Sequence, residues 1–235
     1  MTARATRRGP TPGGVAWRAW VAGRALPLIF WSLLVAAGGL ALRGQLAQLI
    51  REGPSHGPLL ELANGLLTVA FCAMVMAAYL TRSRAGTPAK GFREGVFPML
   101  IFLAGPAGVL LLQFMGMPRR FDLAAPALLV ALGGLVMSLW ALWHLRRSFS
   151  ILAEVRRAVT TGPYRFVRHP LYLGEGLTLL GLCLKLGTLA ALAFWTAISS
   201  LQLMRARIEE EKLSRELSDY DAYRKRTRFI LPGLY

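Results

Sequence analysis

The residues best suited to chemistry gather in two short polar stretches of the chain. Residues 162–174 read GPYRFVRHPLYLG, and residues 205–210 read RARIEE. Together they hold arginine, histidine, tyrosine and glutamate side chains, which bind charged groups and transfer protons. The two stretches can form one site only if the elements between them bring both to the same place.

The first stretch predicts an ordered loop that leads into a helix. Gly162 and Pro163 form a strong turn signal. Pro170 biases His169 away from the helical conformation, and an apolar helix is expected to begin at Leu171.

The composition of the chain is that of an integral membrane protein. Its 235 residues are 54% hydrophobic and 17% charged, and the mean hydropathy is positive. A net charge of +16 on a soluble protein would suggest a nucleic-acid partner. Here the positive residues lie mainly between and after apolar runs, as the positive-inside rule explains, so no nucleic-acid partner is expected. Cys72 and Cys183 lie inside apolar runs, which predicts neither a disulfide nor a metal site.

Four apolar runs predict full membrane spans, because each is long enough to cross a hydrocarbon core of about 30 Å. The first is expected to be an uncleaved helix, since no convincing signal-peptide cleavage site follows it. Prolines and glycines in the third predict a kinked or locally opened helix. Gly133 and Gly134 in the fourth predict a close helix contact. The runs cover residues 26–42, 62–80, 95–118 and 123–145.

A pair of runs at residues 171–184 and 186–204 follows. The first is short for a crossing that needs about 20 apolar residues, so the pair predicts a tight helical hairpin. A hairpin returns the chain to the side that it left, which places residues 146–168 and the tail from Arg205 on one side. The predicted fold is all-α: a polytopic bundle of about six membrane helices, four full spans plus the hairpin, with a helical C-terminal tail.

The charge distribution predicts the orientation. Of the 28 Lys and Arg residues, 23 lie in the first 25 residues, in alternate loops and in the tail. The positive-inside rule then predicts cytoplasmic termini, and the Ala, Gly, Leu and Arg bias favours a bacterial inner membrane. Three regions are expected: a basic cytoplasmic arm at 1–25, a four-helix transmembrane region at 26–145, and a cofactor-binding and catalytic region at 146–235.

The second polar stretch is expected to continue as a helix from the last span. Arg205 lies four residues before Glu209, and Arg207 lies three before Glu210, so each pair is predicted to meet on one helical face. Taken alone, these pairs favour a solvated helix, followed by a basic interfacial segment that contains Phe229.

The combination of motifs resembles the isoprenylcysteine carboxyl methyltransferase family and its relatives, the integral-membrane methyltransferases that include phospholipid N-methyltransferases. The resemblance covers roughly residues 140–235. The chain differs from these relatives at 146–147 and 216–217, where Leu-Gly and Phe-Gly are common. The matching features are Ser-Phe-Ser at 148–150, the block at 162–174, R-x-x-x-E-E at 205–210, and Tyr220, Tyr223 and Pro232.

The resemblance implies that S-adenosylmethionine binds between the central loop and the tail. Glu209 or Glu210 would meet the cofactor's ammonium group, while Arg168 and the free amides after Pro170 would meet its carboxylate. The cofactor-binding residues implied are Tyr164, Arg168, His169, Pro170, Tyr172, Gly174 and Glu210.

The implied catalytic residues are Arg205 and Glu209, and the acceptor is expected to be a lipophilic small molecule or lipid from the bilayer. A carboxylate of an isoprenylcysteine-like or prenyl substrate is already ionised and needs only a cation such as Arg205 to orient it. A phospholipid amine or a small thiol would instead use Glu209 as a base. The sequence does not predict the oligomeric state.

Other interpretations stay open. A sterol-reductase-like membrane enzyme would bind a nicotinamide cofactor, although the short chain and the R-x-x-x-E-E tail argue against it. A transporter or non-catalytic lipid-binding protein is a further alternative, although internal repeats and several ionisable residues at the membrane midplane are not evident. His169 is expected to shape the cofactor site rather than act as a base. Glu175, near the start of an apolar helix, is either functional or directed at the headgroups.

Overall fold

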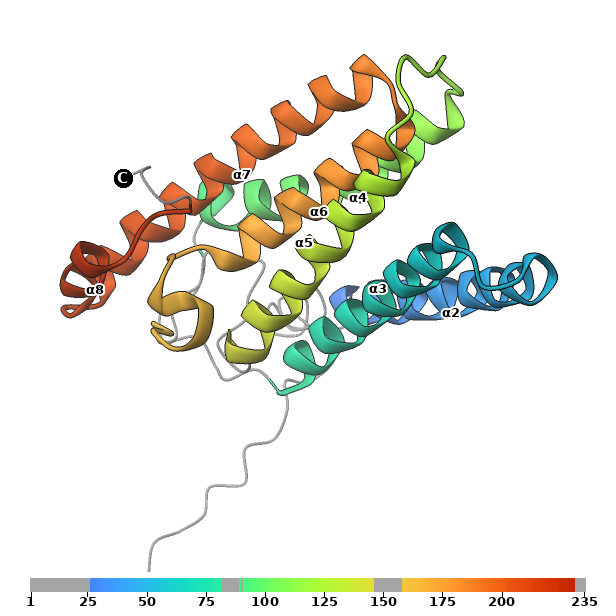
Figure 1. Ribbon diagram of the computed structural model, residues 1–235. Coiled ribbons are helices and arrows are strands. Elements are labelled where there is room, and N and C mark those ends of the chain that lie inside the picture. The colour runs from blue at the N-terminus through green and yellow to red at the C-terminus, as the bar shows by residue number, and fades with distance from the viewer. Residues whose placement is uncertain (1–25, 82–88, 90, 146–157, 231–235) are drawn as a thin grey trace, which may run out of the picture.

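The computed structural model describes residues 26–81, 89, 91–145 and 158–230, and nearly all of them form helices (Figure 1). The described residues form no strand beyond an isolated bridge between Val167 and Arg228. The predicted all-α class is therefore confirmed. The elements are α2 (Leu26–Glu52), α3 (His56–Thr81), the π-helix η2 (Phe92–Val96), α4 (Phe97–Phe114), α5 (Ala124–Leu145), the 3₁₀ helix η4 (Gly162–Arg165), α6 (Pro170–Leu186), α7 (Leu189–Glu216) and α8 (Tyr220–Arg226).

Five of these helices are long and apolar enough to cross a membrane, which makes this a polytopic membrane protein: α2, α3, η2 with α4, α5 and α7. The four predicted spans correspond to the first four. The predicted hairpin is α6 and α7. With 17 residues α6 is the shorter member, whereas the 28 residues of α7 continue past the apolar run into the polar tail.

The third span differs in detail from the prediction. The helix α4 runs on through Pro106, and the irregular turn is the π-helical η2 that precedes it. The apolar run was expected to reach Pro118, but α4 ends at Phe114. Gly116 then adopts a left-handed conformation with φ of 56°, which ends the helix.

Small residues bring α5 and α6 into close contact. A Cβ atom on Gly174 would lie 2.7 Å from the backbone nitrogen of Ser138, and one on Gly181 would lie 2.5 Å from the carbonyl oxygen of Ala127. Gly134 likewise faces Thr178 of α6, whereas Gly133 points into open space. The predicted close contact is therefore made by one glycine of the pair, and it fixes the position of α6 along α5.

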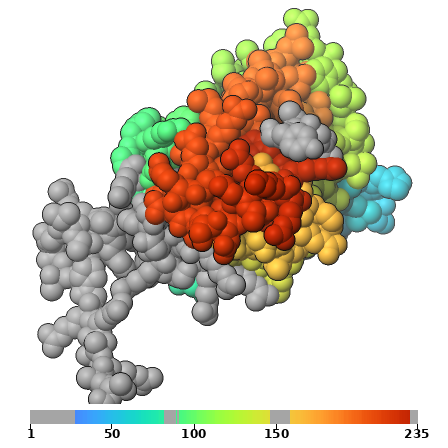
Figure 2. Space-filling view, turned by 90° about the vertical axis from the view of Figure 1, so that its left-hand side faces the viewer, coloured from blue at the N-terminus to red at the C-terminus, as the bar shows by residue number. Residues whose placement is uncertain are grey.

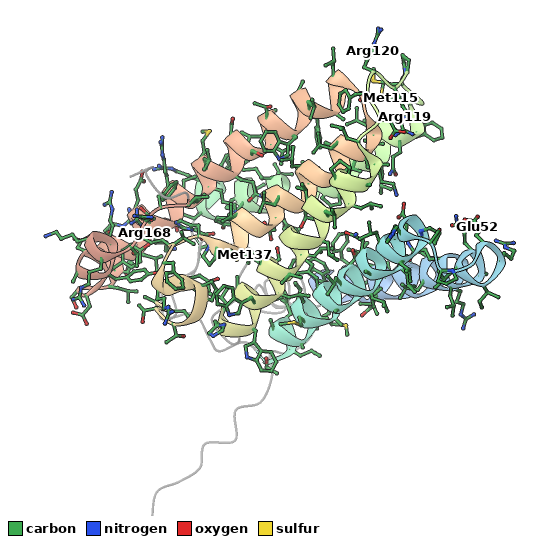
Figure 3. All side chains as sticks on the ribbon, viewed as in Figure 1. Glu52, Met115, Arg119, Arg120, Met137 and Arg168 are labelled. Carbon is green, nitrogen blue, oxygen red and sulfur yellow. The ribbon has the colours of Figure 1, made fainter. Side chains whose placement is uncertain are left out.

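The α6–α7 turn lies at the opposite end of the bundle from the start of α6. Gly187, with φ of 68°, ends α6 and accepts a hydrogen bond from the Arg120 amide at 2.7 Å. Lys185 near this turn forms an ion pair with Glu61 at the start of α3. Figure 3 labels Arg168 at one end of the bundle and Arg119 and Arg120 at the other. The hairpin thus returns α7 to the end where α6 begins.

Two of the three apolar clusters in the described residues hold the spanning helices together. One packs α2, α3 and α5 against η4 and includes Trp31, Tyr79, Leu142 and Tyr164. The other packs α4, α6 and α7. Cys72 and Cys183 are buried free thiols, one in each cluster, which agrees with the prediction that they form no disulfide.

We predict that Gly134→Ala lowers the thermal unfolding temperature while Gly133→Ala does not. A methyl group on Gly134 must displace α6, at a cost of about 1–3 kcal/mol, whereas the same group on Gly133 meets no neighbour and gains helix propensity. The measurement is thermal unfolding of both variants purified in one detergent. Equal unfolding temperatures for the two variants would contradict the proposed contact.

Candidate functional site

The start of α6 is where the central segment and the tail meet. Pro170 occupies the first turn of α6, where its missing N–H costs nothing, and His169 precedes it in a non-helical conformation. The chain after α8 runs alongside this segment. The Arg168 amide donates to the carbonyl oxygen of Arg228 at 2.7 Å, and the His169 amide donates to that of Phe229 at 3.2 Å. In Figure 2 the red C-terminal segment lies against the amber segment that contains η4.

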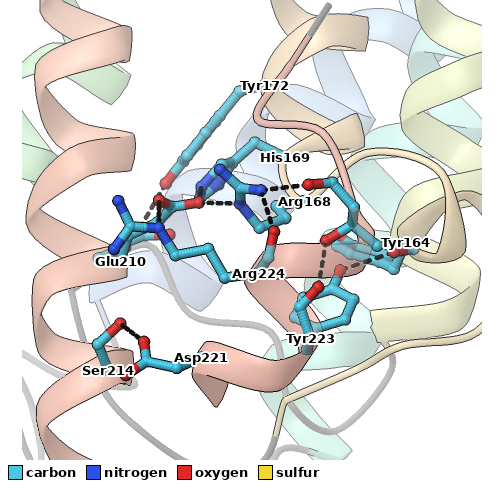
Figure 4. A network of polar contacts seen from close by, with 11 residues as sticks. Tyr164, Arg168, His169, Tyr172, Glu210, Ser214, Asp221, Tyr223 and Arg224 are labelled. Carbon is cyan, nitrogen blue, oxygen red and sulfur yellow. Dashed lines mark hydrogen bonds and ion pairs between the residues drawn. The ribbon is translucent and has the colours of Figure 1, made fainter. Parts of the chain in front are cut away.

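A buried ion pair joins this meeting point to α7. The Nε atom of Arg168 donates to Oε1 of Glu210, and both side chains are almost fully buried (Figure 4). The Nη1 atom of Arg168 also donates to the carbonyl oxygens of Arg224, at 3.0 Å, and Thr227. Arg168 therefore links the start of α6, the middle of the tail and α7 through one guanidinium group.

His169 lies in the same cluster. Its Nε2 atom is 3.2 Å from Oε1 of Glu210. Its ring stacks on Tyr172 with centroids 5.5 Å apart and an interplanar angle of 13°, and it meets Phe229 edge-on at 5.0 Å. The imidazole is thus held on two sides by aromatic rings and on a third by a carboxylate.

A second buried group of charges lies next to the first, deeper along α7. The Tyr172 hydroxyl donates to Oε1 of Glu209, and the Nε atom of Arg205 lies 3.7 Å from the same oxygen. The Arg205 guanidinium is 4.8 Å from the Tyr172 ring centre, and its side chain is 3% exposed. Glu175 of α6 accepts a hydrogen bond from Gln202 of α7 at 3.3 Å. Acid, base and phenol groups are therefore concentrated where water is scarce, which strengthens their interactions.

The successive glutamates of α7 contact different elements, because adjacent helical residues point about 100° apart. Glu209 faces Tyr172 and Glu210 faces Arg168, whereas Glu211 pairs with Arg93 of η2 at 2.8 Å. One residue further, Lys212 pairs with Glu94 of η2 at 2.6 Å. These ion pairs fasten α7 to the segment that opens α4.

Tyr164 of η4 lies beneath the tail. Its carbonyl oxygen accepts a hydrogen bond from the Tyr223 hydroxyl at 2.6 Å. Burial raises the pKa of Tyr223 to about 12 and that of the Tyr164 phenol still further. Both phenols therefore stay protonated at neutral pH, and Tyr223 remains a hydrogen-bond donor.

The structure brings most of the predicted site residues together: Arg168, His169, Tyr172, Arg205, Glu209 and Glu210. Pro170 and Tyr164 are buried beside them. Gly174 faces α5, so the structure gives it a packing role, and its contact with a cofactor stays a prediction. The Ser-Phe-Ser at 148–150 and Pro232 lie outside the described residues.

Three expectations for the tail are wrong. Arg207 is exposed and Glu210 pairs instead with Arg168, which is 42 residues away. The polar section of α7 is not a solvated helix, because its residues Arg205, Glu210 and Lys212 are buried. Phe229, expected in an interfacial segment, is 8% exposed and packs on His169.

The sequence interpretation did not identify several contributing residues. Arg224 lies 3.7 Å from Oε2 of Glu210, and Gln202 bonds to Glu175. Tyr79 of α3 lies within electrostatic reach of Arg205. The spacing of Gln202 three residues before Arg205 is a usable signal, since it places both on neighbouring faces of one helix. No spacing in the sequence indicates that Tyr79 lies near Arg205.

These features define an integral membrane protein with buried charges at one end of its helical bundle. Residues 122–219 match the PEMT family, described as phospholipid methyltransferase. The matched region contains all nine predicted site residues. The resemblance is thereby confirmed at the level of this family, which also includes isoprenylcysteine carboxyl methyltransferases. The match makes membrane methyl transfer the activity to test.

One curated relative is similar over a shorter region. The nickel-cobalt-cadmium resistance protein NccN of Alcaligenes xylosoxydans xylosoxydans is 36% identical over 81 residues. The similarity covers 32% of this chain and 36% of the relative, so the chain spans about a third of that protein's length.

We predict that Glu210→Gln releases the tail from the start of α6. The substitution leaves the Arg168 guanidinium buried without its counter-charge, at a cost of about 3–5 kcal/mol. The amides of Arg168, His169 and Arg228 should then exchange with deuterium at least about tenfold faster. Arg207→Gln, on an exposed position of the same helix, is the control and should leave these rates unchanged. Unaltered protection in Glu210→Gln would refute this role of the pair.

Proposed function

We propose that this protein is an S-adenosylmethionine-dependent methyltransferase that acts on a lipophilic acceptor at the end of the bundle where the tail meets α6. One observation carries the proposal. The two halves of the family motif, separated by the α6–α7 hairpin, are joined by the buried contacts of Arg168 with Glu210 and of Tyr172 with Glu209. The orientation that we propose places this end in the cytoplasm of a bacterial cell, with the bundle in the inner membrane.

The residues present fit the chemistry of the cofactor, which carries an ammonium group, a carboxylate, a sulfonium and an adenine. Carboxylates, guanidinium groups and stacked aromatic rings lie together here. We assign cofactor binding to Tyr164, Arg168, His169, Pro170, Tyr172, Gly174 and Glu210. When bound, the cofactor supplies an electrophilic methyl group.

The ion pairs refine how these residues would act. Arg168 and Glu210 are committed to each other, so we expect them mainly to position the start of α6 against α7. Glu209 is the more accessible carboxylate, with its side chain 22% exposed against 8% for Glu210, and suits the ammonium group better. His169 and Tyr172 offer flat aromatic surfaces.

We assign catalysis to Arg205 and Glu209. Methyl transfer is an in-line displacement, to which alignment and exclusion of water contribute most. The Arg205 guanidinium is held by Glu209 and Tyr172, which suits it to orient an acceptor. The resemblance favours a carboxylate of an isoprenylcysteine-like or prenyl substrate. A phospholipid amine or a small thiol is the second candidate, with Glu209 as the base.

We predict saturable binding of S-adenosylmethionine to the purified protein, weakened at least about tenfold in His169→Ala. This substitution removes the ring that stacks on Tyr172 and contacts Glu210. Isothermal titration calorimetry provides the measurement. His56→Ala, an exposed histidine at the opposite end, should bind the cofactor normally. Binding of a nicotinamide cofactor instead would favour the reductase alternative and overturn the proposal.

We predict that Arg205→Lys reduces methyl transfer by about 100-fold or more while changing cofactor affinity less than about threefold. Lysine keeps the charge but loses the planar fork that can align an acceptor. Transfer of a radiolabelled methyl group, measured beside cofactor binding, separates the two effects. Arg207→Lys is the control on an exposed position. Equal losses of both properties in Arg205→Lys would count against the catalytic assignment.

A further inference from the structure

Glu175 is a partly buried acidic residue for which the proposed mechanism so far has no role. It lies on α6 one turn after Tyr172, and its Oε2 atom accepts a hydrogen bond from Nε2 of Gln202 at 3.3 Å. Gln202 in turn lies one turn before Arg205 on α7. The Glu175–Gln202 pair therefore forms the next polar layer beyond Tyr172 and Arg205, on the side toward the middle of the membrane.

The pair leaves a buried hydrogen-bond acceptor without a donor. Among the residues that the structure describes, Oε1 of Gln202 is buried and has no hydrogen-bond partner. A buried polar atom left in this state costs about 1–3 kcal/mol. A hydrogen-bond donor on a ligand bound at the neighbouring site would satisfy this atom.

The charges around this layer favour the same kind of ligand. Glu175 and Glu209 both lie within electrostatic reach of Arg205, so two carboxylates face one guanidinium group. The neighbouring cations are engaged elsewhere, since Arg168 pairs with Glu210 and Lys212 with Glu94. An anionic acceptor would add a third negative charge to this group, whereas a hydrogen-bond donor would be stabilised by it.

We propose that Glu175 and Gln202 select the methyl acceptor by accepting hydrogen bonds from its reacting group, so that the acceptor is an amine, thiol or alcohol on a lipophilic chain rather than a carboxylate. This inference rests on the proposed methyltransferase function and favours its second class of acceptor over the carboxylate. In the transfer step the acceptor lone pair forms the bond to the methyl carbon. The bond from that carbon to sulfur breaks, its electron pair stays on sulfur, and the acceptor proton passes to Glu175, which takes the place of Glu209 as the base.

The lipophilic chain is expected because of where the pair sits. Both residues lie in helices whose outward positions are apolar, such as Leu182 of α6 and Leu203 and Met204 of α7, which are exposed at the surface of the bundle. A molecule that reaches Glu175 from the lipid side therefore passes along apolar side chains before it meets the carboxylate.

The test compares four amphiphiles with the same alkyl chain: dodecylamine, dodecanethiol, dodecanol and dodecanoate. Binding of each to the cofactor-free protein is measured by native mass spectrometry, and methylation of each is measured separately with radiolabelled S-adenosylmethionine. The variants are Glu175→Gln, Gln202→Leu and the control Glu52→Gln, which removes an exposed carboxylate at the opposite end.

We expect the protein to bind and methylate at least one of the three donors in preference to dodecanoate. Glu175→Gln should weaken binding of that donor about tenfold, consistent with loss of a hydrogen bond to a charged group, while cofactor affinity stays within about twofold. Gln202→Leu should also weaken binding of that donor. This second variant keeps the test valid if Glu175→Gln folds poorly. Glu52→Gln should behave as the unmodified protein.

Preferred binding and methylation of dodecanoate would overturn the inference, as would unchanged donor binding in both site variants. Failure of the proposed function has a different signature, because it appears as loss of cofactor binding and of all methyl transfer. The order of amphiphile binding to the cofactor-free protein still decides the role of Glu175 in that case.

Discussion

The buried ion pair between Arg168 and Glu210 is the interaction on which the organisation of the site depends. A charge removed from water must be paired, and this pair forms only if the start of α6, the middle of the tail and α7 are assembled together. The Arg168 guanidinium meets one carboxylate and two carbonyl oxygens, which leaves little freedom in the position of any of these segments. The ion pair thereby also fixes the positions of His169 and Tyr172.

The close contact between α5 and α6 makes this assembly possible. Small residues at Gly134, Gly174 and Gly181 let the two backbones approach, and the turn at Gly187 returns α7 to the same end. The short length of α6 is part of this geometry. Because α7 is 11 residues longer, it carries its charged section past the apolar layer to the level of the central segment.

The buried charges suit the proposed chemistry because they are arranged in layers along α7. Glu210 belongs to the positioning layer, Arg205 and Glu209 to the proposed catalytic layer, and Gln202 with Glu175 to the layer nearest the membrane centre. The ion pairs of Glu211 and Lys212 with η2 fix the rotation of the helix about its axis. In a site of low dielectric constant, such fixed charges act on a bound molecule more strongly than they would in water.

The apolar runs and prolines of the sequence predicted the helical class, the four spans, the short hairpin and, to within one residue, the start of α6. These features follow from the length of apolar runs and from local backbone restrictions, which act over a few residues. The tertiary structure decided which charges meet. Arg207 is closer in sequence to Glu210 than Arg168 is, yet Arg168 is its partner, because burial selects partners among all elements that pack together rather than along one helix. The burial of Phe229 on His169, the packing role of Gly174 and the bond between Glu175 and Gln202 have the same origin.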